Sequence, residues 1–291
     1  MAAVVQRTEP IYHENHMVSD AMYESKLRPQ LDKALESLGI TEEELSSAVF
    51  DPKQHLLYYA GGDFMQHKYN STRRLSMEEL GLLNKLQISD IGVLDPFPLF
   101  TDDAILIMKA EILRKEVFSK HARFLHSSTS GLDCCVRGYN TTKTTDTAAP
   151  FTTTAWTHPK TTELILRMAG VDLEVVFDYE IAHANISVPD KNDDVELMRE
   201  ARAKYEAGKS SGEDIPAVVG WHNDSYPFVC VLMLSDTLEM IGGETSLRMG
   251  ASEDGVQRVA TVPGPQMGHA SILQGRLIEH IAPKPIGCSE R

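Results

Sequence analysis

The chain has 291 residues, of which 42% are hydrophobic and 24% are charged. This balance is typical of globular proteins and excludes collagen-like, low-complexity and largely disordered chains. A chain of this length often forms two domains, but a single β-rich domain can reach the same size.

The charge balance is strongly acidic, with 28 Lys and Arg residues against 42 Asp and Glu residues and a formal net charge of −14. A nucleic acid is therefore an unfavourable partner, because two polyanions repel each other. No apolar run approaches the roughly 18 residues that a membrane helix needs. We expect a small-molecule substrate, no nucleic-acid partner and no membrane association, and the sequence leaves the oligomeric state open.

The four cysteines are Cys134, Cys135, Cys230 and Cys288, and none of them forms a Cys-x-x-Cys pair. This spacing disfavours a zinc ribbon or a disulfide framework. We interpret them as reduced thiols and expect a cytoplasmic protein. A vicinal disulfide between Cys134 and Cys135 is the alternative, although it needs unusual local geometry.

Residues 1–165 are predicted to be mainly helical. Two capping boxes, Thr41 to Glu44 and Ser76 to Glu79, each precede a helix-favouring stretch. A third helix is expected over 102–120, where apolar residues recur at helical spacing behind two aspartates. Between Gly131 and Pro159 the Thr-rich composition predicts a long loop, either a lid over a site or a solvated connection.

The second half changes to short β-type runs after a helical stretch from Thr161 to Ala169. The predicted strand regions are 173–188, 228–235, 243–249, 256–262 and 270–282. A polar interruption near 190–214, with a helix-like run at 195–205, is expected to be an insertion between strands. Such spacing is typical of a β-sandwich or barrel.

The most informative motif is Gly220 to Ser225, which reads Gly-Trp-His-Asn-Asp-Ser before an apolar run. In an extended strand, side chains two residues apart point to the same face, so His222 and Asp224 are predicted to face a common ligand. An imidazole and a carboxylate are two of the three ligands in the facial triad of non-haem iron sites.

Three further features follow in order: Gly242 to Thr245 at a strand start, Pro263 to Pro265 before another strand, and Gly275 to His280 followed by Pro283, Pro285 and Arg291. Together with the His-x-Asp motif, they resemble the iron(II)- and 2-oxoglutarate-dependent oxygenases over roughly 171–291. The style of the motifs is similar to that of fungal members that act in secondary metabolism.

This resemblance implies an α+β fold with a double-stranded β-helix core, also called a jelly-roll or cupin-like core. The whole chain, 1–291, would be one oxygenase domain. Residues 166–291 would form the core, with the insertion near 190–214, and residues 1–165 would pack on it as the helical portion.

The resemblance also implies the site residues and the cofactors. His222, Asp224 and His280 would be the catalytic metal ligands for Fe(II), with 2-oxoglutarate and dioxygen (O2) as cosubstrates. Arg291 would bind the distal carboxylate of 2-oxoglutarate, since a planar guanidinium suits a carboxylate. The family generally continues through another strand, so either a tail is absent here or another residue shares this carboxylate.

His269 is the rival for the third metal ligand. We prefer His280, because it follows the Gly-Arg-Leu-Ile segment as the distal histidine of the family does. If His280 is the ligand, His269 is expected to be an ordinary, partly buried histidine.

The run from Phe177 to Ser187 is predicted to be a strand with one polar face. Strict alternation would place Tyr179, His183, Asn185 and Ser187 together on that face. We take Tyr179 and Asn185 as contacts of the cosubstrate. The alternative is a half-exposed strand without a role in binding.

The sequence thus predicts a dioxygenase that oxidises a small molecule, and a free amino acid such as valine is the specific expectation. The reaction would be a hydroxylation or an oxidative ring closure to an aziridine. One alternative is a metal-dependent enzyme that uses the same His/Asp/His site without 2-oxoglutarate. A non-catalytic β-barrel binding module is the other.

Overall fold

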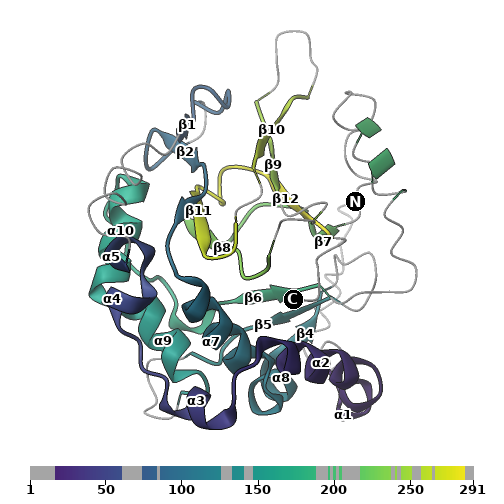
Figure 1. The fold of residues 1–291 in the computed structure, drawn as a ribbon. Coiled ribbons are helices and arrows are strands. Elements are labelled where there is room, and N and C mark those ends of the chain that lie inside the picture. Colours follow the sequence, from purple (N-terminus) through teal and green to yellow (C-terminus); the bar gives the residue numbers. More distant parts are fainter. Residues whose placement is uncertain are drawn as a thin grey trace, which may run out of the picture.

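The computed structural model describes residues 17–60, 74–83, 86–125, 133–140, 147–187, 217–236, 244–250, 257–263 and 266–285, together with 196, 199–200, 203–204 and 240. Helices gather along one side of the molecule and strands occupy its centre (Figure 1). The α-helices are α1 (Asp20–Met22), α2 (Arg28–Leu38), α3 (Glu42–Ser47), α4 (Pro52–His55), α5 (Leu57–Ala60), α7 (Asp102–Leu113), α8 (Lys115–His121), α9 (Pro150–Thr157) and α10 (Pro159–Ala169). A π-helix spans Tyr23–Leu27 and a 3-10 turn spans Asp178–Glu180.

The strands form three sheets in which every pairing is antiparallel. The first sheet has the order β1-β2-β11-β3, with β8 also paired to β11; these strands are β1 (Arg74–Ser76), β2 (Ile91–Leu94), β3 (Phe97–Pro98), β8 (Val229–Leu232) and β11 (His269–Leu273). The second has the order β10-β9-β12-β7, made of β7 (Ala217–His222), β9 (Thr245–Arg248), β10 (Val259–Val262) and β12 (His280–Pro283). The third has the order β4-β5-β6, made of β4 (Ala122–Phe124), β5 (Cys134–Val136) and β6 (Ala184–Ile186).

The α+β class predicted from the sequence is therefore confirmed. The division into a helical first part and a β-rich second part is less sharp than expected. Strands β1 to β5 all lie before residue 165, and β2 and β3 pair with β11 from the C-terminal part. These strands have only two to four residues, too few to produce a recognisable alternating pattern.

The capping boxes both form, but only one begins a helix. The Thr41 hydroxyl accepts from the Glu44 N–H, and the Glu44 carboxylate accepts from the Thr41 N–H at the start of α3. Ser76 and Glu79 make the same reciprocal bonds, yet the residues after them form turns. Gly81 there has a positive φ of 70°, a conformation that stops helix propagation.

The helix predicted over 102–120 is present as two helices, α7 and α8, because Arg114 between them has extended backbone with ψ of 145°. The loop predicted between Gly131 and Pro159 is wrong in part, since β5 and α9 lie within it, while 141–146 lie outside the described residues. Local sequence does not reveal α9, because its N-terminus is capped by Glu111, a distant residue in the chain.

The later strand predictions are largely confirmed, with two corrections. The run 270–282 is two strands, β11 and β12, joined by a turn. Of the run 173–188, only β6 is a strand, and Tyr179 lies in the 3-10 turn before it. Most of the expected insertion at 190–214 lies outside the described residues, although residues 196, 199–200 and 203–204 are helical.

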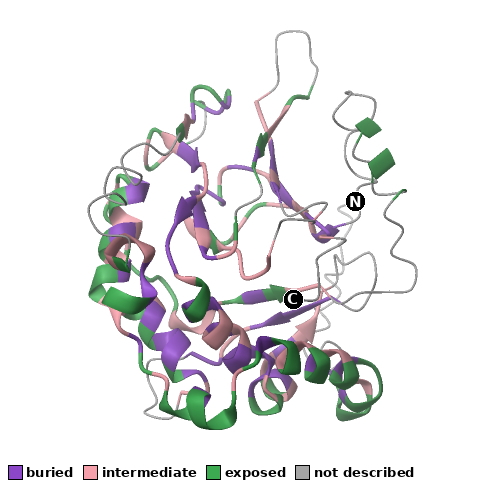
Figure 2. Ribbon diagram, viewed as in Figure 1, coloured by how far each residue is buried: buried purple, intermediate pink, exposed green. Residues whose placement is uncertain are grey.

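Two of the apolar clusters position the first and second sheets, whose strands include buried segments coloured purple in Figure 2. One cluster joins helices α7, α9 and α10 to strands β2, β3 and β11. The other lies between the first and second sheets and contains Val93, Leu273, Leu247, Val262 and Ile278. Within the described part of the chain, no helix is long and apolar enough to cross a membrane.

Candidate metal centre

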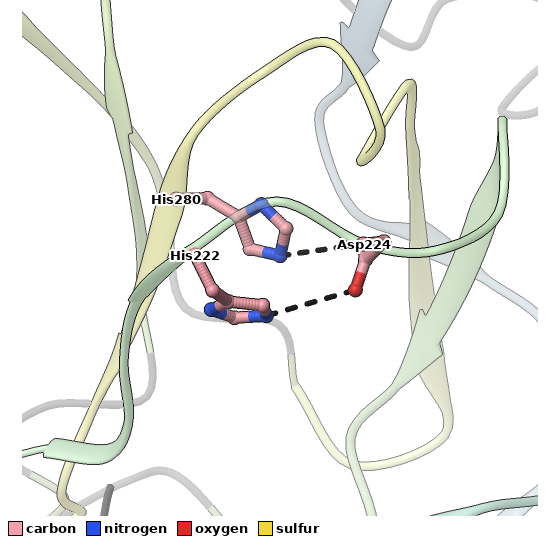
Figure 3. A group of neighbouring side chains, drawn as sticks. All are labelled: His222, Asp224 and His280. Atoms are coloured by element: carbon pink, nitrogen blue, oxygen red, sulfur yellow. Dashed lines mark ion pairs between the residues drawn. The ribbon is translucent and has the colours of Figure 1, made fainter. Parts of the chain in front are cut away.

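Three of the predicted site residues meet at the end of the second sheet (Figure 3). His222 is the last residue of β7 and His280 is the first residue of β12, and the two are opposite each other in the antiparallel pairing. Asp224 lies two residues beyond the end of β7, and its N–H donates to the Gly275 carbonyl at 3.0 Å. Strand pairing and this one backbone bond thus bring the three side chains together.

The ligand atoms of these residues converge closely. One atom from each of His222, Asp224 and His280 lies within 4.8 Å of the other two. His222 Nε2 is 3.6 Å from Asp224 Oδ1, and His280 Nε2 is 3.4 Å from Asp224 Oδ2. The two imidazole rings have centroids 4.2 Å apart and planes inclined by 50°. This arrangement can bind one divalent ion between two nitrogens and one carboxylate.

Backbone carbonyls fix the orientation of both imidazoles. His222 Nδ1 lies 2.7 Å from the Gly220 carbonyl oxygen, and His280 Nδ1 lies 3.0 Å from that of Ile278. A carbonyl oxygen can only accept, so each Nδ1 carries the proton and donates it. Each neutral ring then presents the lone pair of Nε2 to the centre, which is the orientation that metal-binding histidines adopt.

The carboxylate of Asp224 fits the same role. Its Oδ2 atom is buried and has no hydrogen-bond partner among the described residues. A buried, unsatisfied carboxylate oxygen is unfavourable unless a cation or a donor approaches it. The described residues therefore fit a divalent metal, which would satisfy Oδ2 and both Nε2 atoms at once.

Gly275 determines how closely the backbone approaches this carboxylate. A Cβ atom at position 275 would lie only 1.9 Å from Asp224 Oδ2. Only glycine leaves room for Asp224 to turn inward here. No local pattern in the sequence signals this role, because the partner of the glycine is distant in the chain.

The two histidines differ in the direction of their pKa shifts. Burial lowers the pKa of His280, which favours its neutral, metal-binding form. Burial acts in the same direction on His222, but the Asp224 carboxylate and the Gly220 carbonyl raise its pKa overall. The raised pKa of His222 shows that the Asp224 carboxylate favours positive charge at this place, where a divalent cation would lie.

Residues next to the two histidines brace this end of the sheet. The Arg248 guanidinium lies over the Trp221 ring, 4.3 Å from its centroid, and its Nη1 is 2.5 Å from Glu279 Oε1. Trp221 precedes His222, and Glu279 precedes His280, so one arginine ties the two histidine-bearing segments together. This contact was not predicted from the sequence, because it depends on the pairing of distant strands.

The remaining predicted residues lie elsewhere. His269 begins β11 in the first sheet, where its Nδ1 contacts the Met267 carbonyl, and it does not belong to the His/Asp/His group. Asn185 lies on β6 in the third sheet, and Tyr179 lies in the 3-10 turn before β6. Arg291 lies outside the described residues, so its predicted role remains a prediction.

The sequence matches no protein-family model, and no similar curated protein or solved structure was found.

Proposed function

We propose that the protein is an iron(II)- and 2-oxoglutarate-dependent oxygenase whose metal ligands are His222, Asp224 and His280. The observation that carries the proposal is the convergence of two correctly oriented Nε2 atoms and one unsatisfied carboxylate oxygen within 4.8 Å. Two histidines and one carboxylate on one side of an ion leave its other positions open, and non-haem iron oxygenases use those positions for cosubstrate and oxygen.

The order of the strands supports a jelly-roll core as the finer description of the fold. From β7 to β12 the chain alternates between sheets: β7 is in the second, β8 in the first, β9 and β10 in the second, β11 in the first and β12 in the second. An antiparallel sandwich built in this way has the character of a double-stranded β-helix. The apolar cluster between the two sheets fits the same arrangement.

In this proposal the bound iron supplies, with 2-oxoglutarate and dioxygen, the oxidising power to attack an unactivated C–H bond. The protein residues orient the ligands and restrict water. The His280 side chain is only 8% exposed, whereas those of His222 and Asp224 are 32% and 21% exposed. A substrate would therefore approach from the side of His222 and Asp224, while His280 anchors the closed side.

For the substrate we propose a small metabolite, with a free amino acid such as valine as the first compound to test. Hydroxylation and ring closure to an aziridine are the two outcomes that the family resemblance implies. The same three ligands could also serve a metal-dependent enzyme without 2-oxoglutarate, because catalytic zinc sites likewise use three protein ligands and an open position.

The decisive experiment is anaerobic reconstitution with Fe(II) and 2-oxoglutarate, followed by exposure to oxygen with a panel of free amino acids. We expect substrate-dependent succinate release by the wild type and by His269→Ala, and none by Asp224→Ala. Metal content is measured on the same samples. A wild type that holds iron but shows no spectral change and no succinate with 2-oxoglutarate would favour the second enzyme class. Unchanged metal content in His222→Ala and Asp224→Ala would instead indicate a binding module.

A further inference from the structure

The third sheet has one apolar and one charged face. Cys134, Val136 and Ala184 lie on the face that packs into an apolar cluster with helix α8. On the opposite face, Arg123 of β4 is directly across from Cys135 of β5. Residues paired in this way share a face, so the arginine side chain belongs to the side away from the apolar cluster.

The same face continues along both neighbouring strands. Cys135 is also paired with Asn185 of β6, and alternation adds Arg137, two residues after Cys135, to this side. His183 precedes Asn185 by two residues, and its Nδ1 lies 3.1 Å from Glu180 Oε2. Arg137 Nη1 lies 3.3 Å from the other oxygen of the same carboxylate. Glu180 is thus shared by two cations.

The Tyr179 ring holds the two arginines near each other. The Arg123 and Arg137 guanidinium carbons lie 5.8 Å and 6.0 Å from the centroid of this ring. The ring itself packs on Gly138, where a Cβ atom would come within 2.2 Å of it. We call Arg123, Arg137, Tyr179, Glu180 and His183 the arginine cluster.

The arginine cluster carries more positive than negative charge in a strongly acidic chain. Burial alone would lower the pKa of His183, but its hydrogen bonds with Cys135 and Glu180 raise the pKa to about 9. The raised pKa favours the charged form of the ring. One carboxylate, that of Glu180, lies against two arginines and this histidine.

Two guanidinium nitrogens of the arginine cluster are unsatisfied. Arg123 Nη1 and Arg137 Nε are buried and have no hydrogen-bond partner among the described residues. A buried charged donor without a partner costs free energy, which an oxyanion would recover through charge-assisted hydrogen bonds. Arginine is the side chain best suited to such contacts with carboxylates and similar anions.

We propose that Arg123 and Arg137 form an oxyanion-binding subsite that receives a carboxylate group. The carboxylate can come from the organic substrate or from the cosubstrate. This assignment to a carboxylate rests on the proposed function, whereas the capacity to bind an oxyanion does not. Tyr179 and Asn185, predicted from the sequence as cosubstrate contacts, lie at or beside the same subsite.

The test uses sulfate as a minimal oxyanion and measures thermal unfolding of the full-length, metal-free protein. Each sulfate concentration is compared with sodium chloride at equal ionic strength. When the sulfate concentration is ten times the Kd for sulfate, specific binding is expected to raise the Tm of the protein by about 3 °C beyond its value in the chloride control. General salt stabilisation acts on every variant alike, so the comparison between variants isolates the subsite.

The variants are Arg123→Met and Arg137→Met, with Arg167→Met as the matched control. Arg167 pairs with Glu163 on the surface of α10 and lies over the Tyr58 ring, outside the arginine cluster. We expect the additional shift in the wild type and in Arg167→Met, and its loss in at least one of the other two. Arg123→Lys and Arg137→Lys keep the charge but lose the planar fork, and they should weaken the shift partially.

The proposal is overturned if the wild type shows no additional shift, or if both cluster variants retain it in full. Each variant is compared with itself in two salts, so a lower baseline stability does not obscure the result.

A repeat with Mn(II) and saturating 2-oxoglutarate identifies the source of the carboxylate. Loss of the sulfate-dependent shift in Tm indicates the cosubstrate, and retention of the shift indicates the substrate. The sulfate series requires no turnover, so its failure is distinguishable from failure of the oxygenase assay.

Discussion

At the residue scale, the geometry of the candidate metal centre depends on groups outside the proposed ligands. The Gly220 and Ile278 carbonyls set the tautomers of the two histidines, and the Gly275 carbonyl accepts from the Asp224 N–H. Gln274, which is fully buried, holds the turn in place through bonds from its amide to the Ser89 and Ile91 carbonyls. The ligand geometry therefore follows from the position of the turn after β11.

Gly275→Ala tests this dependence. The new Cβ atom would overlap Asp224 Oδ2, which would have to rotate away from the two imidazoles. We expect metal affinity to fall about tenfold or more, as it does when groups that orient ligands are lost. The measurement is metal retention after dialysis against a weak chelator of graded concentration.

Gly39→Ala is the control for Gly275→Ala. Gly39 has a positive φ of 67° at the end of α2, and no atom lies within 4 Å of the place that a Cβ would take, so this change strains the backbone without touching the site. It should lower Tm yet leave metal affinity unchanged. Equal metal affinity in Gly275→Ala and the wild type would contradict the role assigned to this glycine.

The sequence allowed the His222 and Asp224 pair to be predicted because their spacing is local. His280 required knowledge of strand register, which only the family resemblance supplied. The place of Tyr179 was partly wrong, because Ala182, with a positive φ of 57°, breaks the alternation between Tyr179 and His183. Such a conformation in a non-glycine residue is uncommon and is not readable from composition.

At the element scale, the N-terminus of α9 depends on a carboxylate from another helix. Glu111 of α7 is 1% exposed, and its oxygens accept from the Phe151 N–H, the Thr152 N–H and the Thr152 hydroxyl, at 2.6 to 3.0 Å. A negative charge at a helix N-terminus is favourable. The Thr-rich composition of this region concealed the helix because its cap comes from a distant part of the chain.

Glu111→Gln is expected to lower the free energy of unfolding by about 1–3 kcal/mol, since an amide cannot accept from all three donors and leaves buried donors unpaired. Denaturant unfolding measures the loss, and Glu36→Gln, an exposed glutamate on α2, is the control with no expected effect.

The difference in free energy of unfolding between the wild type and Glu111→Gln should also depend on pH. Burial raises the pKa of Glu111 in the folded protein above its unfolded-state pKa. As pH falls from neutral towards the unfolded-state pKa, the folded wild type takes up this proton before the unfolded chain does, so the wild type gains stability. The variant cannot take up this proton, so its stability deficit relative to the wild type should widen. A deficit that shrinks on acidification would contradict the raised pKa.

At the scale of the whole molecule, the two parts of the chain form one structure. Strand β11 pairs with β8 from its own part on one side, and with β2 and β3 from the N-terminal part on the other. Ser271 of β11 donates to the Leu94 carbonyl, and Ala270 and Ile272 pack into the cluster with α7, α9 and α10. The sequence indicated one domain only through the family resemblance, because pairing between distant short strands leaves no local pattern.

This organisation predicts that residues 166–291 will not fold alone, although they contain all three proposed metal ligands. Without β2 and β3, β11 becomes an exposed edge and the apolar residues under it are open to water. We expect the isolated fragment to unfold without a cooperative transition and to retain no metal, and co-expression with 1–165 to restore both properties. Circular dichroism during heating and metal analysis of the purified fragment are the measurements. If the fragment unfolds cooperatively and retains one divalent ion, the C-terminal part is an autonomous domain, and the turn around Gly275 does not need the N-terminal strands to position Asp224.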